Sequence, residues 1–239
     1  MKNLGELKTP IYRGFKGIAT IRMPLLLSGR SREGYTVDVP REPASFADVI
    51  KLRMENPKDS LQIWRGQNIY TIDASVAGAQ KDHLVVLDAK LLHELTRLSE
   101  YSMYDGALLL DDGVWDELKA HKDTTLYLTA EEVVEAEGKG YIKKEGIWIP
   151  ANRTVGKVWE HLGRGVNLQS YAQFVSEEPL GIELVMNIYF NSTSKDSTAR
   201  DVATMRPWVA PTFDNCFPAI GYESLNSGFG YLVGIAKQD

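Results

Sequence analysis

Short apolar runs recur along the chain, separated by polar or glycine-bearing segments. Residues 15–27 alternate apolar and polar side chains, which predicts a strand or a strand pair with an edge, a bulge or a bend at Pro24, because proline cannot donate to a ladder. Residues 61–72 predict one β-hairpin, and residues 141–150 predict a second that turns at Lys144-Glu-Gly146. Further runs predict strands at 35–39, 84–87, 107–110, 125–128, 181–190, 217–220 and 228–235.

Two polar stretches are predicted to connect these elements. Residues 74–82 are small and polar, and residues 192–215 are polar with prolines at 207 and 211. Because proline interrupts both helices and central strands, we expect the second stretch to be irregular.

Helix starts are marked by residues that cap the first turn. Ser45 is a good N-cap, with Asp48 at the N3 position where a carboxylate favours the positive helix end. Thr129 is followed three residues later by Glu132, the pattern of a capping box. The other predicted caps are Asp88, Asp111 or Asp112, Thr154 and Asn167. Apolar stripes at helical spacing predict core positions at Leu91, Leu92, Leu95, Leu98, Trp115, Val155, Val158, Trp159 and Leu162.

Alternating short strands and helices with hairpins favour an α+β fold over a doubly wound parallel one. Hairpins require antiparallel neighbours, so we expect a mixed or mainly antiparallel sheet with several short helices. The candidate domain boundary lies at Pro150. It divides a β-rich part, 1–150, from a helix-then-strand part, 151–239, and a single continuous domain remains the alternative.

The composition is that of an ordinary globular protein, with 44% hydrophobic and 25% charged residues among 239. The apolar runs are far shorter than the ~20 residues of a membrane helix, so we expect no membrane partner. The first residues, MKNLGELKTPIYRG, lack the apolar stretch of a secretory signal. The expected location is therefore the cytoplasm or an assembled particle, not the exterior.

Charge is distributed unevenly. Residues 1–32 carry seven basic and one acidic residue, a net charge of +6, and residues 111–137 carry two basic and nine acidic residues, a net charge of −7. Such blocks can steer association with another surface. The predicted interface residues are Leu4, Leu7, Ile11, Tyr12, Arg13, Arg30 and Arg32, with Trp148 and Trp208 as exposed aromatic anchors.

Motifs for common chemistries are missing from the sequence. The four histidines have no metal-binding spacing, the single Cys216 cannot supply a cysteine zinc site, and no phosphate-binding glycine motif occurs. Asp112 and Asp116 could share a cation, but we favour a role at the start of a helix. We therefore name no catalytic residue, metal ligand or cofactor, and favour a non-enzymatic protein, with an active site built from distant residues left open.

The segment AIGYESLNSGFGYL, residues 219–232, resembles the glycine-rich loop near the end of CRISPR RNA-processing proteins of the repeat-associated (RAMP) type. Gly221, Gly228, Phe229 and Gly230 match that pattern, while Ala219 replaces its first glycine and the spacing is one residue longer. The resemblance implies two ferredoxin-like domains that cut or hold guide RNA.

Three hypotheses follow. The first is a non-enzymatic assembly or interaction protein, such as a structural component of a viral or other large particle, which binds a protein partner or forms a homo-oligomer. The alternative is an RNA-binding or RNA-processing protein that uses the basic N-terminal residues and the glycine-rich end. A less favoured third is a metal-dependent hydrolase built on Asp111–Asp116.

Overall fold

A computed structural model gives the fold of the protein. It describes residues 6–8, 12–16, 27–28, 40–55, 68–93, 103–104, 106–111, 113–176, 184–190, 202–211, 218–222, 224–225 and 231–236. The fold is α+β with mixed sheets, which confirms the predicted class.

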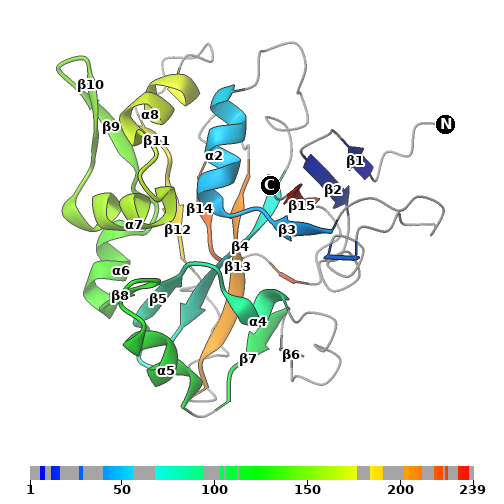
Figure 1. Ribbon diagram of the computed structural model, residues 1–239. Coiled ribbons are helices and arrows are strands. Elements are labelled where there is room, and N and C mark those ends of the chain that lie inside the picture. Colours follow the sequence, from blue (N-terminus) through cyan, green and yellow to red (C-terminus); the bar gives the residue numbers. More distant parts are fainter. Residues whose placement is uncertain are drawn as a thin grey trace.

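Two long antiparallel strands, β4 (Ile69–Ala77) and β13 (Thr204–Ala210), run side by side through the centre of the larger sheet (Figure 1). The main path of this sheet is β1-β2-β15-β4-β13-β14-β12, and β15 is parallel to β4 but antiparallel to β2. Its other strands are β1 (Glu6–Lys8), β2 (Tyr12–Lys16), β3 (Arg41–Pro43), β5 (His83–Val86), β6 (Met103–Tyr104), β7 (Ala107–Leu109), β8 (Thr125–Leu128), β12 (Ile188–Tyr189), β14 (Ala219–Ile220) and β15 (Tyr231–Ala236).

A smaller sheet has the order β10-β9-β11. Its strands are β9 (Tyr141–Lys144), β10 (Ile147–Pro150) and β11 (Leu184–Val185). The predicted second hairpin is confirmed, and it turns at Glu145 and Gly146, whose φ angles are 51° and 84°. Positive φ at both turn positions matches the right-handed twist of the flanking strands. Both sheets contain strands from either side of residue 150.

The described helices are α2 (Phe46–Glu55), α4 (Lys90–His93), α5 (Val114–Ala120), α6 (Ala130–Ala136), α7 (Arg153–Gly163) and α8 (Leu168–Ser176). Figure 1 shows α6, α7 and α8 beside the β9–β10 hairpin, on the opposite side of β4 and β13 from β1 and β2. Helix α2 packs against both α7 and β4.

Three of the predicted caps are confirmed. Ser45 and Asp48 bond reciprocally at the start of α2, Thr129 and Glu132 form a complete capping box on α6, and the Asn167 side chain accepts from the Ser170 amide. Each is a local interaction over three residues, which explains why the sequence revealed it.

Three predicted caps are wrong, at Thr154, at Asp111 and at Asp88, the last of which is described with the site below. Helix α7 is capped by Asn152, whose side chain accepts from the Val155 amide at 2.8 Å, while the Thr154 hydroxyl donates to Glu135. Helix α5 begins after Gly113, which makes no side-chain cap, so Asp111 does not cap it.

Strand β13 corrects the expectation that residues 192–215 are irregular. It is buried along its whole length, and the register with β4 shifts between Pro207 and Val209. Such an irregularity lets a central strand contain a proline without leaving a ladder bond unmade. Likewise, β4 continues to Ala77, into the stretch that was expected to be a connection.

The strand predicted at 181–190 is divided in two. Strand β11 belongs to the smaller sheet and β12 to the larger one. Between them, Met186 has φ of 58°, a left-handed conformation that reorients the chain. A period-two pattern cannot reveal such a turn, because both short strands have apolar residues.

The sheet is buried on both faces by two apolar clusters. One contains Phe46, Trp159 and Trp208, and the other contains Tyr70, Ile72 and Leu84 from β4 and β5. Trp159, Val155, Val158, Leu162 and Leu92 are buried, as predicted, whereas Trp115 is only half-buried. Leu95 and Leu98 lie outside the described residues.

The expected exposure of two interface tryptophans is wrong. Trp148 is 3% exposed and Trp208 is 0% exposed, and both belong to the cluster around Trp159. Trp208 lies on the central strand β13 and not in an irregular segment, and Trp148 lies on the hairpin face that packs against α8.

Candidate functional site

Asp73 is a buried carboxylate in the middle of β4, and four elements meet at it. Its side chain is 0% exposed. It accepts from the amides of Phe46 at 2.7 Å and Asp88 at 3.0 Å, and from the guanidinium of Arg164. Phe46 is the first residue of α2, so Asp73 also places a negative charge at the positive end of that helix. One side chain therefore fixes β4, α2, the segment after β5 and the end of α7.

Burial raises the pKa of Asp73 to about 6, and the charge of Arg164 together with the two amide donors offsets part of this increase. Arg164 follows α7 in a left-handed conformation and extends to both oxygens of Asp88, at 3.1 and 3.2 Å. The Asp88 side chain is 59% exposed, so the ion pairs run from the buried Asp73 to the surface. Asp88 is thus a partner of Arg164 and not the cap that the sequence predicted.

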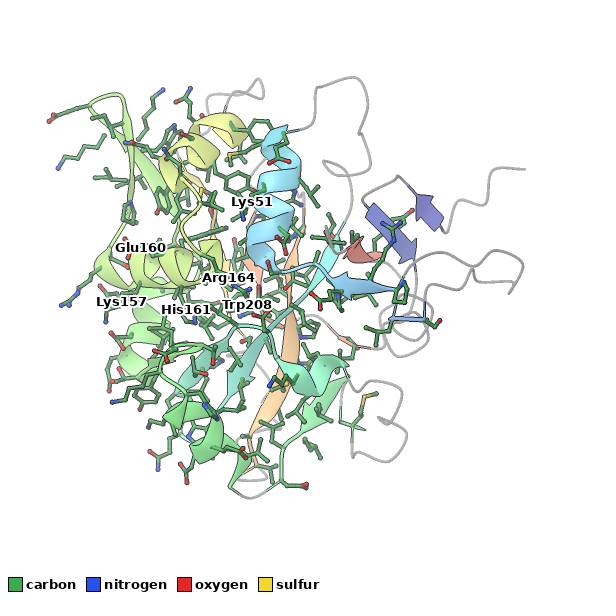
Figure 2. All side chains as sticks on the ribbon, viewed as in Figure 1. Lys51, Lys157, Glu160, His161, Arg164 and Trp208 are labelled. Carbon is green, nitrogen blue, oxygen red and sulfur yellow. The ribbon has the colours of Figure 1, made fainter. Side chains whose placement is uncertain are left out.

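Figure 2 shows Arg164 and His161 at the inner end of α7, near Trp208 and the centre of the molecule, with Lys157 and Glu160 farther out along the same helix. The His161 ring lies 3.1 Å from the Val85 carbonyl oxygen, and burial lowers its pKa. Helix α7 therefore supports the end of β5 as well as the segment that follows it.

Three consecutive amides hold the segment after β5. The Leu87 amide donates to the carbonyl of Thr124 at 2.8 Å, and the Ala89 amide donates to the carbonyl of Ile72 at 3.0 Å. Between them, the Asp88 amide donates to the Asp73 carboxylate. Asp88 itself has a φ of 49°. A segment anchored at every residue forms a rigid wall, which is a preorganised support for a binding site.

This wall borders a hollow of about 560 Å³ that we call the α5 hollow. Its floor consists of the buried Val86, Ala89 and Met205, and its sides of the half-buried Leu91, Val114 and Leu118. The remaining lining residues are Leu87, Asp88, Lys90, Glu117, His121 and Thr124. A concave, mainly apolar site of this volume with a few polar groups is typical of ligand and partner pockets.

A second hollow, of about 370 Å³, lies beside Trp115 and Lys119 of the same helix. It is lined by the rings of Trp115 and Tyr127, with the Lys119 ammonium 3.7 Å from the Tyr127 ring centroid. Helix α5 buries none of its own residues. With a hollow on both sides and only half-buried contacts beneath it, α5 should open locally at a lower energetic cost than the core helices.

The structure describes only some of the interface residues that the sequence predicted near the N-terminus. Tyr12 and Arg13 lie on β2, where they pair with Ile235 and Gly234 of β15, and Leu7 lies on β1. Leu4, Ile11, Arg30 and Arg32 lie outside the described residues. Their role in an interface stays a prediction.

Gly221 has a packing reason to be glycine. A Cβ atom there would lie 2.7 Å from the Ser75 hydroxyl and 3.2 Å from the Trp208 ring, closer than such contacts tolerate. The other residues of the glycine-rich resemblance, Gly228, Phe229 and Gly230, lie outside the described residues. RNA binding by this segment stays a prediction.

Sequence reasoning missed Asp73 and Arg164, which are 91 residues apart. One signal was available: Asp73 is the only charged residue in the run IYTIDASVA, and a carboxylate inside a buried strand needs partners. Nothing in the sequence named those partners.

Across the described ranges, no three histidine, cysteine or acidic side chains come together as a metal-binding group. No helix in the same ranges is long and apolar enough to cross a membrane.

No protein-family model matches the chain, and neither does any curated protein. A solved structure does match: it was reported as showing how the C-type lectin fold accommodates massive sequence variation in Nanoarchaeota. The TM-score is 0.60 at 12% identity, over 99% of this chain and 100% of that chain. This chain has the C-type lectin fold. The two ferredoxin-like domains implied by the glycine-rich resemblance are therefore not the architecture of this protein.

Proposed function

We propose that this protein is a non-enzymatic interaction protein that binds a protein partner through the α5 hollow. The observation that carries the proposal is the hollow itself: an apolar floor and apolar sides that remain open beside a wall fixed by Asp73 and Arg164. Interfaces are typically anchored by a few apolar or aromatic side chains that fill such pockets.

The sides of the hollow supply the gain in binding energy. Leu91, Val114 and Leu118 are half-buried in the free protein, so a partner side chain removes the rest of their surface from water. Burying an apolar side chain fully is worth about 1.5–3 kcal/mol, and completing a half-buried one is worth roughly half of that. Lys90 and Glu117 are exposed lining residues of opposite charge, and exposed charges of this kind govern the approach of a partner more than its affinity.

The comparison with the Nanoarchaeota structure supports a recognition role. A shared fold at 12% identity means that the backbone arrangement is kept while nearly every side chain differs. A scaffold of this kind supports binding surfaces of different specificity, because function resides in sites placed on a fold.

A more specific form of this proposal is that the protein assembles into a larger particle, such as a viral one. Its support is the charge of +6 at residues 1–32 and of −7 at residues 111–137, a range that includes α5. Contacts between unlike surfaces of identical subunits close into rings or extend into fibres. Sedimentation of the full chain at low and high salt measures this, and a monomer under both conditions with no bound partner contradicts it.

The experiment that tests the binding site is affinity capture by the tagged full chain from its source cells. Leu118→Lys places a charge in the hollow, and Val134→Lys is the matched control, because Val134 is 77% exposed on α6. We expect the wild type and the control to capture the same partner and Leu118→Lys to lose it while keeping its circular dichroism spectrum. Equal capture by all three would overturn the proposal.

A further inference from the structure

A groove of about 360 Å³ separates the edge strand β10 from helix α8. Gly146, Ile147 and Trp148 line one side, and Gln169, Ser170, Gln173 and Phe174 line the other. It shares no lining residue with the α5 hollow. The groove therefore belongs to a different surface from the one that the proposed function uses.

The register of the hairpin determines which backbone groups face the groove. Lys144 pairs with Ile147 across the two-residue turn, so these residues exchange the first pair of hydrogen bonds. The next pair, Lys143 and Trp148, is then a non-hydrogen-bonded pair, whose N–H and C=O groups point away from the neighbouring strand. Lys143 Nζ lies 5.9 Å from the Trp148 ring centroid, as expected for side chains directly opposite each other.

Strand β10 is at the edge of its sheet, so the outward N–H and C=O of Trp148 have no strand to receive them among the described residues. An edge residue with an exposed donor and acceptor is a template for another extended chain. Pro150, two residues along, has an outward carbonyl but no N–H. It limits the pairing to a short segment, which protects the edge from unrestricted extension.

The α8 side of the groove offers side-chain contacts to such a segment. Gln169 and Gln173 are one helical turn apart on α8, as are Ser170 and Phe174, so each pair lies on one face of the helix. Gln169 and Ser170 are exposed polar side chains that can bond to a backbone, and the half-buried Phe174 offers an apolar contact. Ile147, on the strand side, is 52% exposed.

We propose that β10 binds an extended segment of a partner protein as an added strand, held between β10 and α8. Its backbone bonds to the N–H and C=O of Trp148 and to the carbonyl of Pro150, and one apolar side chain packs between Trp148 and Phe174. This is the mode in which main-chain bonds give affinity and one pocket gives selectivity. A second copy of this chain is disfavoured as occupant, because its β10 would bring its own β9 and α8 into a groove of only about 360 Å³.

The test begins with a phage library of random ten-residue peptides panned on the immobilised full chain. An enriched peptide is synthesised with a fluorescent label, and its affinity is measured by anisotropy. The peptide is then remade with a single N-methyl group on each amide in turn. We expect tenfold or greater losses at alternating amides and small changes between them, because only every second amide of an added strand faces β10.

Two variants locate the peptide. Ser170→Trp fills the groove from an exposed position and should lower the affinity at least tenfold, whereas Val134→Trp on α6 should leave it unchanged. Leu118→Lys should also leave it unchanged, which separates this inference from the proposed function. The inference is overturned if no peptide is enriched, if N-methylation shows no alternation, if Leu118→Lys abolishes binding, or if Ser170→Trp only abolishes self-association of the chain.

Discussion

Removing Arg164 should lower the free energy of unfolding, because Arg164 pairs with the buried Asp73 carboxylate that anchors the wall of the α5 hollow. Arg164→Met keeps the aliphatic stem but leaves Asp73, which is 0% exposed, with only the amides of Phe46 and Asp88 as donors. Breaking a buried ion pair from one side typically destabilises by about 3–5 kcal/mol. Because two hydrogen bonds remain, we expect a loss of about 3 kcal/mol in the free energy of unfolding at pH 8.

The loss in the free energy of unfolding of Arg164→Met should grow as the pH rises. The pKa of Asp73 is raised to about 6, and Arg164 lowers it, so the variant raises it further. Between the ordinary pKa of 3.8 and the raised value, the folded state binds more protons than the unfolded state, and stability falls as pH rises. At pH 5 Asp73 is largely protonated and has little need of a cation. The penalty should therefore be large at pH 8 and small at pH 5.

The assay is urea unfolding of wild type and variant at the two pH values. Asp88→Asn is the control for the exposed part of the network, because an exposed ion pair contributes about 1 kcal/mol or less. A loss below about 1 kcal/mol at pH 8, or an equal loss at both pH values, refutes the assignment of Asp73 as the anchoring charge.

Three further predictions can be measured in the same way. Leu162→Ala should lower the free energy of unfolding by about 2–5 kcal/mol, because Leu162 is 0% exposed; a neutral result would contradict its placement. Thr129→Ala should cost about 1 kcal/mol by removing the capping box of α6, and an unchanged urea midpoint would argue against that box. His83→Phe should make the protein more resistant to acid between pH 6.5 and about 4: burial lowers the pKa of His83 to about 4, so the unfolded state takes up the proton first; an identical acid titration of both proteins would contradict this.

Local features of the fold were readable from the sequence. The helix caps at Ser45 and Thr129 and the turn at Glu145-Gly146 each depend on residues within a few positions of one another. The α+β class followed from the predicted hairpins and from the presence of both strand-like and helix-like hydrophobic periods along the chain. Such interactions are determined by neighbouring side chains, which the sequence displays directly.

Long-range features were not readable. Strand β13 contains Pro207, which argues against a central strand unless a register shift is known in advance. Trp208 was placed at the surface for the same reason. The site depends on Asp73, Asp88 and Arg164, which come together only because α7 ends beside β4 and β5. Neither spacing nor composition predicts that meeting.

The central claim is that the partner occupies the α5 hollow, and hydrogen exchange of the full chain with and without its captured partner tests it most directly. The amides of residues 87–89 are already hydrogen-bonded, two to backbone carbonyls and one to the Asp73 carboxylate, whereas α5 buries none of its residues and should exchange quickly in the free protein. We predict that binding slows exchange at residues 114–120 and at the rim near Lys90. Slowing confined to other surfaces, with residues 114–120 unchanged, would contradict the claim.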